Sequence, residues 1–136
     1  MLHNVSYNNP DITRQINEAV GKPYSLMHRI KRGGVGSERL RIMQASPKIA
    51  KLLDYNSDIA YCNIEFRPGG IIVRFRHILE TYAWVIPWWK LAVIQNGKSL
   101  TLYRDADFMR LEAQNKAGIQ RSLVQRLLDG KAAAAH

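Results

Sequence analysis

Cysteine is almost missing from this chain of 136 residues, which contains Cys62 and no other. A lone cysteine excludes an intramolecular disulfide and favours a reducing, cytoplasmic setting, so a buried core must hold the fold together. The N-terminus also lacks a basic start followed by a long apolar run, and we therefore expect no signal peptide. The length suits one domain.

The chain also lacks a long hydrophobic run. Its most apolar stretch is "YAWVIPWWKLAVI", residues 82–94, which contains Pro87 and Lys90. A bilayer-spanning helix needs about 20 apolar residues, so we expect no transmembrane segment, and Pro87 argues against an interfacial helix. Tyr, Trp, Val and Ile favour a pleated, half-buried surface, and we expect two strands that meet at a corner at Pro87.

Acidic residues are scarce, with 11 Asp and Glu against 20 Lys and Arg and a net charge of +9. Such an excess favours an anionic partner such as nucleic acid, lipid headgroups or an acidic protein, although a basic composition without any such role is the alternative. The excess is spread along the chain as +4 in residues 1–58, +2 in 59–112 and +3 in 113–136. No segment has the composition of a basic tail.

Two turn motifs predict antiparallel hairpins. Pro68-Gly69 suits a type II turn, with positive φ at the glycine. This turn pairs Phe66 with Ile71, Ile64 with Val73 and Cys62 with Phe75. Asn96-Gly97 suits a two-residue type I′ turn. That turn pairs Gln95 with Lys98, Val93 with Leu100 and Leu91 with Leu102. Each hairpin then has one apolar face, as expected for a sheet that covers a core on one side.

Capping residues predict helices near both ends. Asn9 and Pro10 begin the first helix and Gly21 follows it, while Asn115 begins the last and Gly130 lies just past its end. The residues expected to face the core are Ile12, Ile16 and Val20 in the first helix and Ile119, Leu123, Leu127 and Leu128 in the last.

The order of elements predicts an α+β domain with a bent antiparallel β-meander, in the form of a half-barrel or barrel. A short helix is expected from Ser46-Pro47 to Leu53, while "SLMHRIKR" and "ERLRIMQA" fit a strand or a helix equally. The expected parts are a helical or irregular segment at 1–58, a meander of about five strands at 59–112, a helix packed on the sheet at 113–130 and a flexible tail at 131–136.

This order, with "VIPWWKL" and a closing helix, resembles the bacterial pleckstrin-homology-like domains over residues 60–129. The basic hairpin is similar to the Lys/Arg…Arg-x-Arg pattern with which some members hold phosphoinositide headgroups. The resemblance implies a loop position for Arg67 and second-strand positions for Arg74 and Arg76. It also implies a seven-stranded binding scaffold, to which residues 1–58 must contribute strands, and it leaves the ligand open.

Two groups of cations are therefore candidate anion sites. For Arg74, the alternative is a cross-strand ion pair with Glu65 on the same sheet face. Residues 28–41 hold a second group, Arg29, Lys31 and Arg32, beside a glycine loop whose amides could cradle phosphate. This segment matches no phosphate-loop motif and contains no aromatic residue except His28, so a surface loop is the alternative.

The tryptophans supply candidate interface residues. Trp84 is expected in the core. Adjacent positions of a strand point to opposite faces, so Trp88 and Trp89 cannot both be buried in one layer, and one of them is expected at an edge or interface.

Catalytic groupings are missing. Cys62 is expected to face inward as a buried, inert thiol, the histidines show no metal-ligand spacing, and Asp105 and Asp107 fall where a turn is expected. We expect no enzyme activity, cofactor or metal.

The leading hypothesis is a non-enzymatic binding or assembly module that acts through sheet edges and Trp-bearing surface, with a protein partner or as a homo-oligomer. The alternative is recognition of phosphate, in phospholipid headgroups or nucleic acid, by the basic surface.

Overall fold

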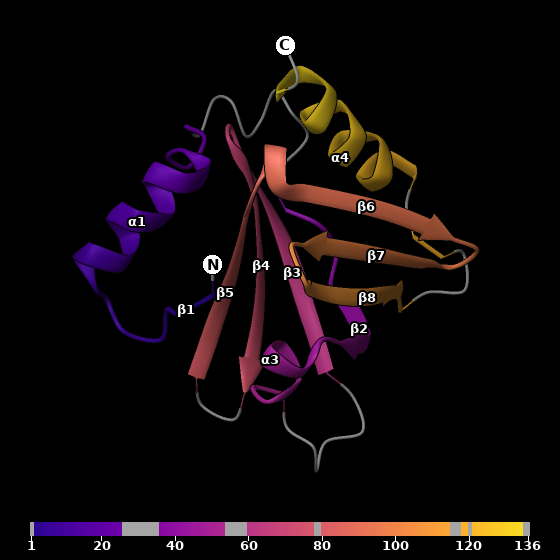
Figure 1. Ribbon diagram of the computed structural model, residues 1–136, viewed down its shortest axis with the longest axis horizontal. Coiled ribbons are helices and arrows are strands. Elements are labelled where there is room, and N and C mark those ends of the chain that lie inside the picture. The colour runs from indigo at the N-terminus through magenta and orange to yellow at the C-terminus, as the bar shows by residue number, and fades with distance from the viewer. Residues whose placement is uncertain are drawn as a thin grey trace.

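The computed structural model describes residues 2–25, 36–53, 60–77, 80–114, 118–119 and 121–134. Its centre is an eight-stranded antiparallel sheet in the order β1-β5-β4-β3-β2-β8-β7-β6 (Figure 1). The strands are β1 (Leu2–Asn4), β2 (Leu40–Ala45), β3 (Ala60–Arg67), β4 (Gly70–His77), β5 (Glu80–Pro87), β6 (Leu91–Asn96), β7 (Ser99–Arg104) and β8 (Asp107–Ala113). The helices are α1 (Pro10–Val20), α3 (Pro47–Ala50) and α4 (Arg121–Ala134), with a short 3₁₀ helix, η1 (Trp88–Lys90).

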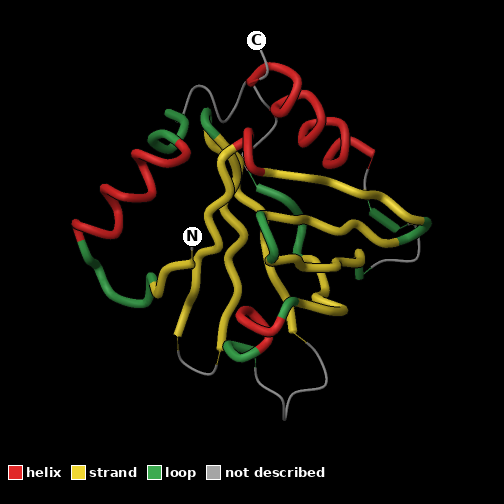
Figure 2. Tube along the Cα trace, in the orientation of Figure 1, coloured by secondary structure: helices red, strands yellow, loops and turns green. Residues whose placement is uncertain are grey.

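The sheet is strongly bent but is not closed into a barrel. Strands β5 and β6 lie near opposite ends of the strand order, yet only the three residues of η1 join them. The two halves of the sheet must therefore fold toward each other, and Figure 2 shows β6–β8 crossing the direction of β3–β5. Pro87 ends β5 at this corner, as its position in the sequence predicts.

Helices cover two different parts of the sheet. Helix α1 lies on the outer face of β4 and β5, where Ile16 and Val20 pack against Ile72 and Val85. Helix α4 packs beside η1 and β6 and adds Leu123 and Leu127 to the main core, which fills the inside of the bend. Trp84 is fully buried in that core, as expected.

The first hairpin has the predicted register but a different turn. Phe66 pairs with Ile71, Ile64 with Val73 and Cys62 with Phe75. Gly69 does not adopt the positive φ of a type II turn, so that part of the prediction is wrong. The glycine is required for close approach instead, because its N–H donates to the Val20 carbonyl at 2.7 Å and a Cβ would lie 3.0 Å from that backbone.

The second hairpin is shifted by two residues from the predicted register. Asn96 pairs with Ser99, Gln95 with Leu100 and Val93 with Leu102. Gly97 is the first of the two turn residues and has a φ of +59°, which suits a type II′ turn, while Lys98 has no positive φ. Because the shift is even, the same side chains still face the core.

The helix predictions hold at the N-terminus and fail in part elsewhere. In α1, the Asn9 side chain accepts hydrogen bonds from the amides of Asp11 and Ile12. Helix α3 ends at Ala50 rather than Leu53, and residues 40–45 of the ambiguous "ERLRIMQA" segment form β2. Residues 26–32 and Asn115 lie outside the described residues.

Helix α4 does not stop at Gly130 but continues to Ala134. A Cβ at Gly130 would lie 2.4 Å from the Trp88 ring, so the glycine makes room for the indole instead of ending the helix. Leu128 is 46% exposed and does not belong to the buried stripe of Leu123 and Leu127.

We predict that Gly130→Ala destabilises the protein by about 1–3 kcal/mol, because the added methyl group forces the buried indole to move. A change in helix propensity alone would stabilise the protein by about 1 kcal/mol. Thermal unfolding followed by circular dichroism distinguishes the two effects. Ser122→Ala, at an exposed position of the same helix, is the control and should leave the melting temperature unchanged or slightly raised. An equal rise for Gly130→Ala would contradict the packing argument.

Candidate functional site

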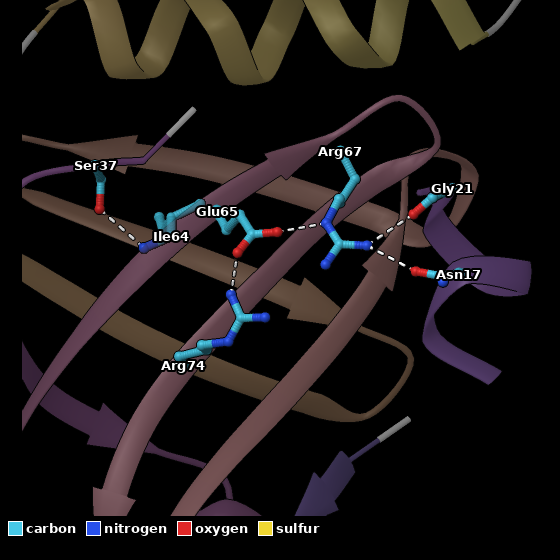
Figure 3. A network of polar contacts seen from close by, with 7 residues as sticks. All are labelled: Asn17, Gly21, Ser37, Ile64, Glu65, Arg67 and Arg74. Carbon is cyan, nitrogen blue, oxygen red and sulfur yellow. Dashed lines mark hydrogen bonds and ion pairs between the residues drawn. The ribbon is translucent and has the colours of Figure 1, made fainter. Parts of the chain in front are cut away.

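Arg67, the predicted loop cation of the first anion site, is buried inside a polar network (Figure 3). It is the last residue of β3, and its side chain is 7% exposed. The guanidinium donates from Nε to the Glu65 carboxylate and from Nη1 to Asn17 Oδ1 at 3.1 Å and the Gly21 carbonyl at 2.8 Å. Arg67 therefore fastens the end of α1 to the first hairpin.

The Arg74 guanidinium, on β4, donates a hydrogen bond to the second carboxylate oxygen of Glu65. Burial raises the pKa of Glu65, but the hydrogen bond from Arg67 and the charge of Arg74 outweigh this effect, so the pKa of the carboxyl lies below its usual value. The carboxylate is thus held ionised between two guanidinium groups.

The structure brings Arg67 and Arg74 together, but around a carboxylate rather than an open site. The cross-strand ion pair considered for Arg74 is present, and Glu65 additionally neutralises Arg67. Arg76 is exposed further along β4 and makes no ion pair among the described residues. The second predicted group, Arg29, Lys31 and Arg32, lies outside the described residues.

Trp88 and Trp89 lie in η1 rather than on successive positions of a strand. Trp88 is buried, and its indole N–H donates to the Pro68 carbonyl at 3.0 Å. Trp89 is 76% exposed, and the Lys90 ammonium lies 5.0 Å from the centre of its ring. One tryptophan therefore fixes the corner of the sheet, and the other is presented to solvent.

Strand β6 ends the sheet, and no described strand pairs with its outer side. In a hairpin with a two-residue turn, the two residues that flank the turn form hydrogen bonds with each other. Every second residue before them along the strand also bonds to the partner strand. Asn96, Ile94 and Ala92 thus bond to β7, whereas the backbone N–H and C=O groups of Val93 and Gln95 point outward. The next outward carbonyl, that of Leu91, accepts a hydrogen bond from the Lys131 ammonium.

The predicted anion-binding and interface residues do not line one common cavity. A cavity of about 410 Å³ lies between the first hairpin and α4, and its lining includes Phe66, Arg67, Trp88 and Arg126. The Arg126 guanidinium lies 4.1 Å from the centre of the Phe66 ring. Trp89, Arg74 and Arg76 do not line this cavity, so the predicted anion and interface residues form separate surfaces.

Cys62 is buried on the inner face of β3, and burial raises the pKa of its thiol to about 12. Asp105 has a φ of +54° and lies at the tight turn between β7 and β8, where a turn residue was expected. Within the described ranges, no cluster of His, Cys, Asp and Glu side chains has the arrangement of a metal site. No helix in the same ranges has the length and apolarity needed to span a bilayer.

No protein-family model, curated protein or solved structure matches this chain.

We predict that Glu65→Gln destabilises the protein by about 3 kcal/mol near neutral pH, because it leaves the buried Arg67 without its counter-ion. The folded-state pKa of Glu65 is depressed, so its stabilising contribution is present above the unfolded-state value of about 4.3 and is lost as the pH falls through the folded-state pKa. Urea unfolding at several pH values should show a smaller acid destabilisation in the variant than in the wild type.

Asp11→Asn is the matched control, because Asp11 pairs with Arg14 on the exposed surface, where both side chains are more than 60% exposed. Such pairs contribute about 0–1 kcal/mol. If both variants lose the same small amount of stability, the buried network does not have the role assigned to it.

We also predict that Cys62 does not react with a thiol reagent in the folded protein, since the thiolate is both inaccessible and disfavoured. Labelling in the presence and absence of urea, followed by mass spectrometry, measures this. Complete labelling of the native protein within minutes would contradict the burial.

Proposed function

We propose that this protein is a non-enzymatic binding module that takes an extended segment of a protein partner along the outer edge of β6. The observation that carries this proposal is that no described strand pairs with the outer edge of β6, which follows directly after the exposed Trp89. Backbone groups at such an edge pair with an added strand, and neighbouring side chains select its sequence.

The open backbone groups of Val93 and Gln95 supply the pairing. Each added strand residue that faces them can exchange hydrogen bonds with two groups that no described strand pairs. Strand β6 contains no charged residue and no proline, which are common devices that keep an edge from pairing.

Trp89 supplies an anchor next to this edge. A tryptophan offers a large contact area at low conformational cost and is among the residues that contribute most at interfaces. Ile94 adds a second exposed apolar side chain, 53% exposed, on the outer face of β6. An added strand therefore meets backbone donors, an aromatic ring and an aliphatic side chain within a few residues.

The charges favour an acidic partner over a second copy of the chain. Two copies of β6 paired antiparallel through Val93 and Gln95 would bring Lys90 of one copy opposite Lys98 of the other, and like charges placed opposite each other are destabilising. The net charge of +9 opposes self-association further. A homo-oligomer is thus the second choice for the occupant of this edge.

The proposal also draws on the resemblance to pleckstrin-homology-like domains. Seven consecutive strands, β2 to β8, are followed by the C-terminal helix α4, and β2 comes from the N-terminal part of the chain. The resemblance implies a binding scaffold, which agrees with a module that has no catalytic grouping among its described residues. Phosphate binding by Arg67 and Arg74 has less support, because both already hold Glu65.

Selection of extended peptides from a random display library on immobilised protein tests the proposal. Selected peptides should be acidic, and in ¹H–¹⁵N spectra they should shift the Trp89 indole signal and the amides of β6 while the Trp84 signal stays in place. Gln95→Pro removes an outward N–H without touching the bonds to β7, and it should weaken peptide binding at least about 10-fold.

Gln95→Ala is the matched control and should bind as the wild type does, whereas Trp89→Ala should bind more weakly. Circular dichroism establishes that each variant is folded. If peptides bind but shift resonances of another face, or if Gln95→Pro binds as well as Gln95→Ala, the edge is not the binding site. Light scattering that shows a dimer sensitive to Gln95→Pro would assign the edge to a second copy.

A further inference from the structure

Four exposed arginines lie on the outer face of the sheet, away from the core. Arg41 on β2 pairs with Tyr61 on β3 and with Glu112 on β8, and these side chains share the outer face. The alternation of side chains along each strand places three further arginines on the same face. They are Arg39 just before β2, Arg76 on β4 and Arg110 on β8.

These four arginines, called the outer arginine face from here on, are not neutralised as Arg67 and Arg74 are. None of them forms an ion pair with another described residue. Glu65 shares the face but is occupied by its two arginines, and Glu112 is half-buried opposite Arg41. The face therefore keeps a local excess of positive charge, which comes from guanidinium groups that can hold phosphate oxygens in pairs.

Aromatic rings lie between and beside these arginines. The Arg39 guanidinium lies 4.0 Å from the centre of the Tyr61 ring, and this contact holds the guanidinium on the surface of the sheet. Tyr103 and Phe108 form a half-buried ring pair, 6.0 Å between centres, on the β7–β8 part of the same face. Arginines interleaved with aromatic rings on a sheet are the features that bind the backbone and bases of single-stranded nucleic acid.

We propose that the outer arginine face binds single-stranded nucleic acid, with the arginines on the phosphates and the rings beside the bases. This site is separate from the β6 edge and does not depend on the function proposed for that edge. The sheet bends around its core, so the outer face is convex. A flexible single strand can follow a convex surface, whereas a planar bilayer touches only part of it.

The proposal predicts binding of a fluorescein-labelled, single-stranded oligonucleotide of about 12 thymidines, measured by fluorescence anisotropy at several salt concentrations. Each phosphate contact on a single strand contributes about −0.7 to the slope of log K against log salt, so four contacts give a slope of about −3. Arg41→Gln/Arg110→Gln should reduce this slope by about 1.4 and weaken binding about 20-fold at about 0.1 M salt.

Lys22→Gln/Lys98→Gln removes the same charge from exposed positions after α1 and in the β6–β7 turn, which are not among the four arginines, and serves as the control. It should bind nearly as tightly as the wild type, and circular dichroism checks that both variants are folded. No binding at low salt overturns the proposal, and so does an equal loss in the two double variants, which would mean that net charge alone attracts the strand. Binding to phosphatidylserine vesicles through Arg41 and Arg110, with no binding to the oligonucleotide, would assign the face to a membrane and overturn it as well.

Discussion

The short passage from β5 to β6 is the constraint on which the rest of the structure depends. Three residues carry the chain from one half of the sheet to the far edge of the other, so the sheet has to bend and enclose a core. Trp88 holds this corner by its hydrogen bond to the Pro68 carbonyl and by its contact with the Phe66 ring. The same corner seats α4 through Gly130 and leaves Trp89 on the surface.

Local sequence patterns were sufficient for most of the fold from residue 60 onward. Alternating side chains and turn residues predicted both hairpins, the corner at Pro87 and the faces of their strands. The predicted register of the second hairpin was wrong by two residues, because a pattern with a period of two does not distinguish registers that differ by an even number of residues. In the first hairpin the register was right although Gly69 serves a contact with Val20 rather than a type II turn.

The features that the sequence did not reveal depend on residues far apart in the chain. Asn17 and Gly21 meet Arg67 across about 50 residues, and Gly130 meets Trp88 across 42, so neither contact leaves a local pattern. Among the candidate sites, the ion pair of Glu65 with Arg74 followed from strand register, whereas the burial of Arg67 did not. The basic segment that contains Arg39 has no aromatic residue except His28, and Tyr61 becomes a neighbour of Arg39 only when β2 pairs with β3.

The hydrogen bond from Lys131 to the Leu91 carbonyl marks one end of the outer edge of β6 that no described strand pairs. A partner segment that paired with β6 as proposed would meet outward backbone groups at Val93 and Gln95, and then the Leu91 carbonyl, which already accepts a hydrogen bond from Lys131. A short partner segment bound in the proposed way would leave this hydrogen bond in place, while a longer one would have to displace Lys131 from it. In the proposed binding mode, the Lys131 contact would thus couple the length of the bound segment to the last turn of α4.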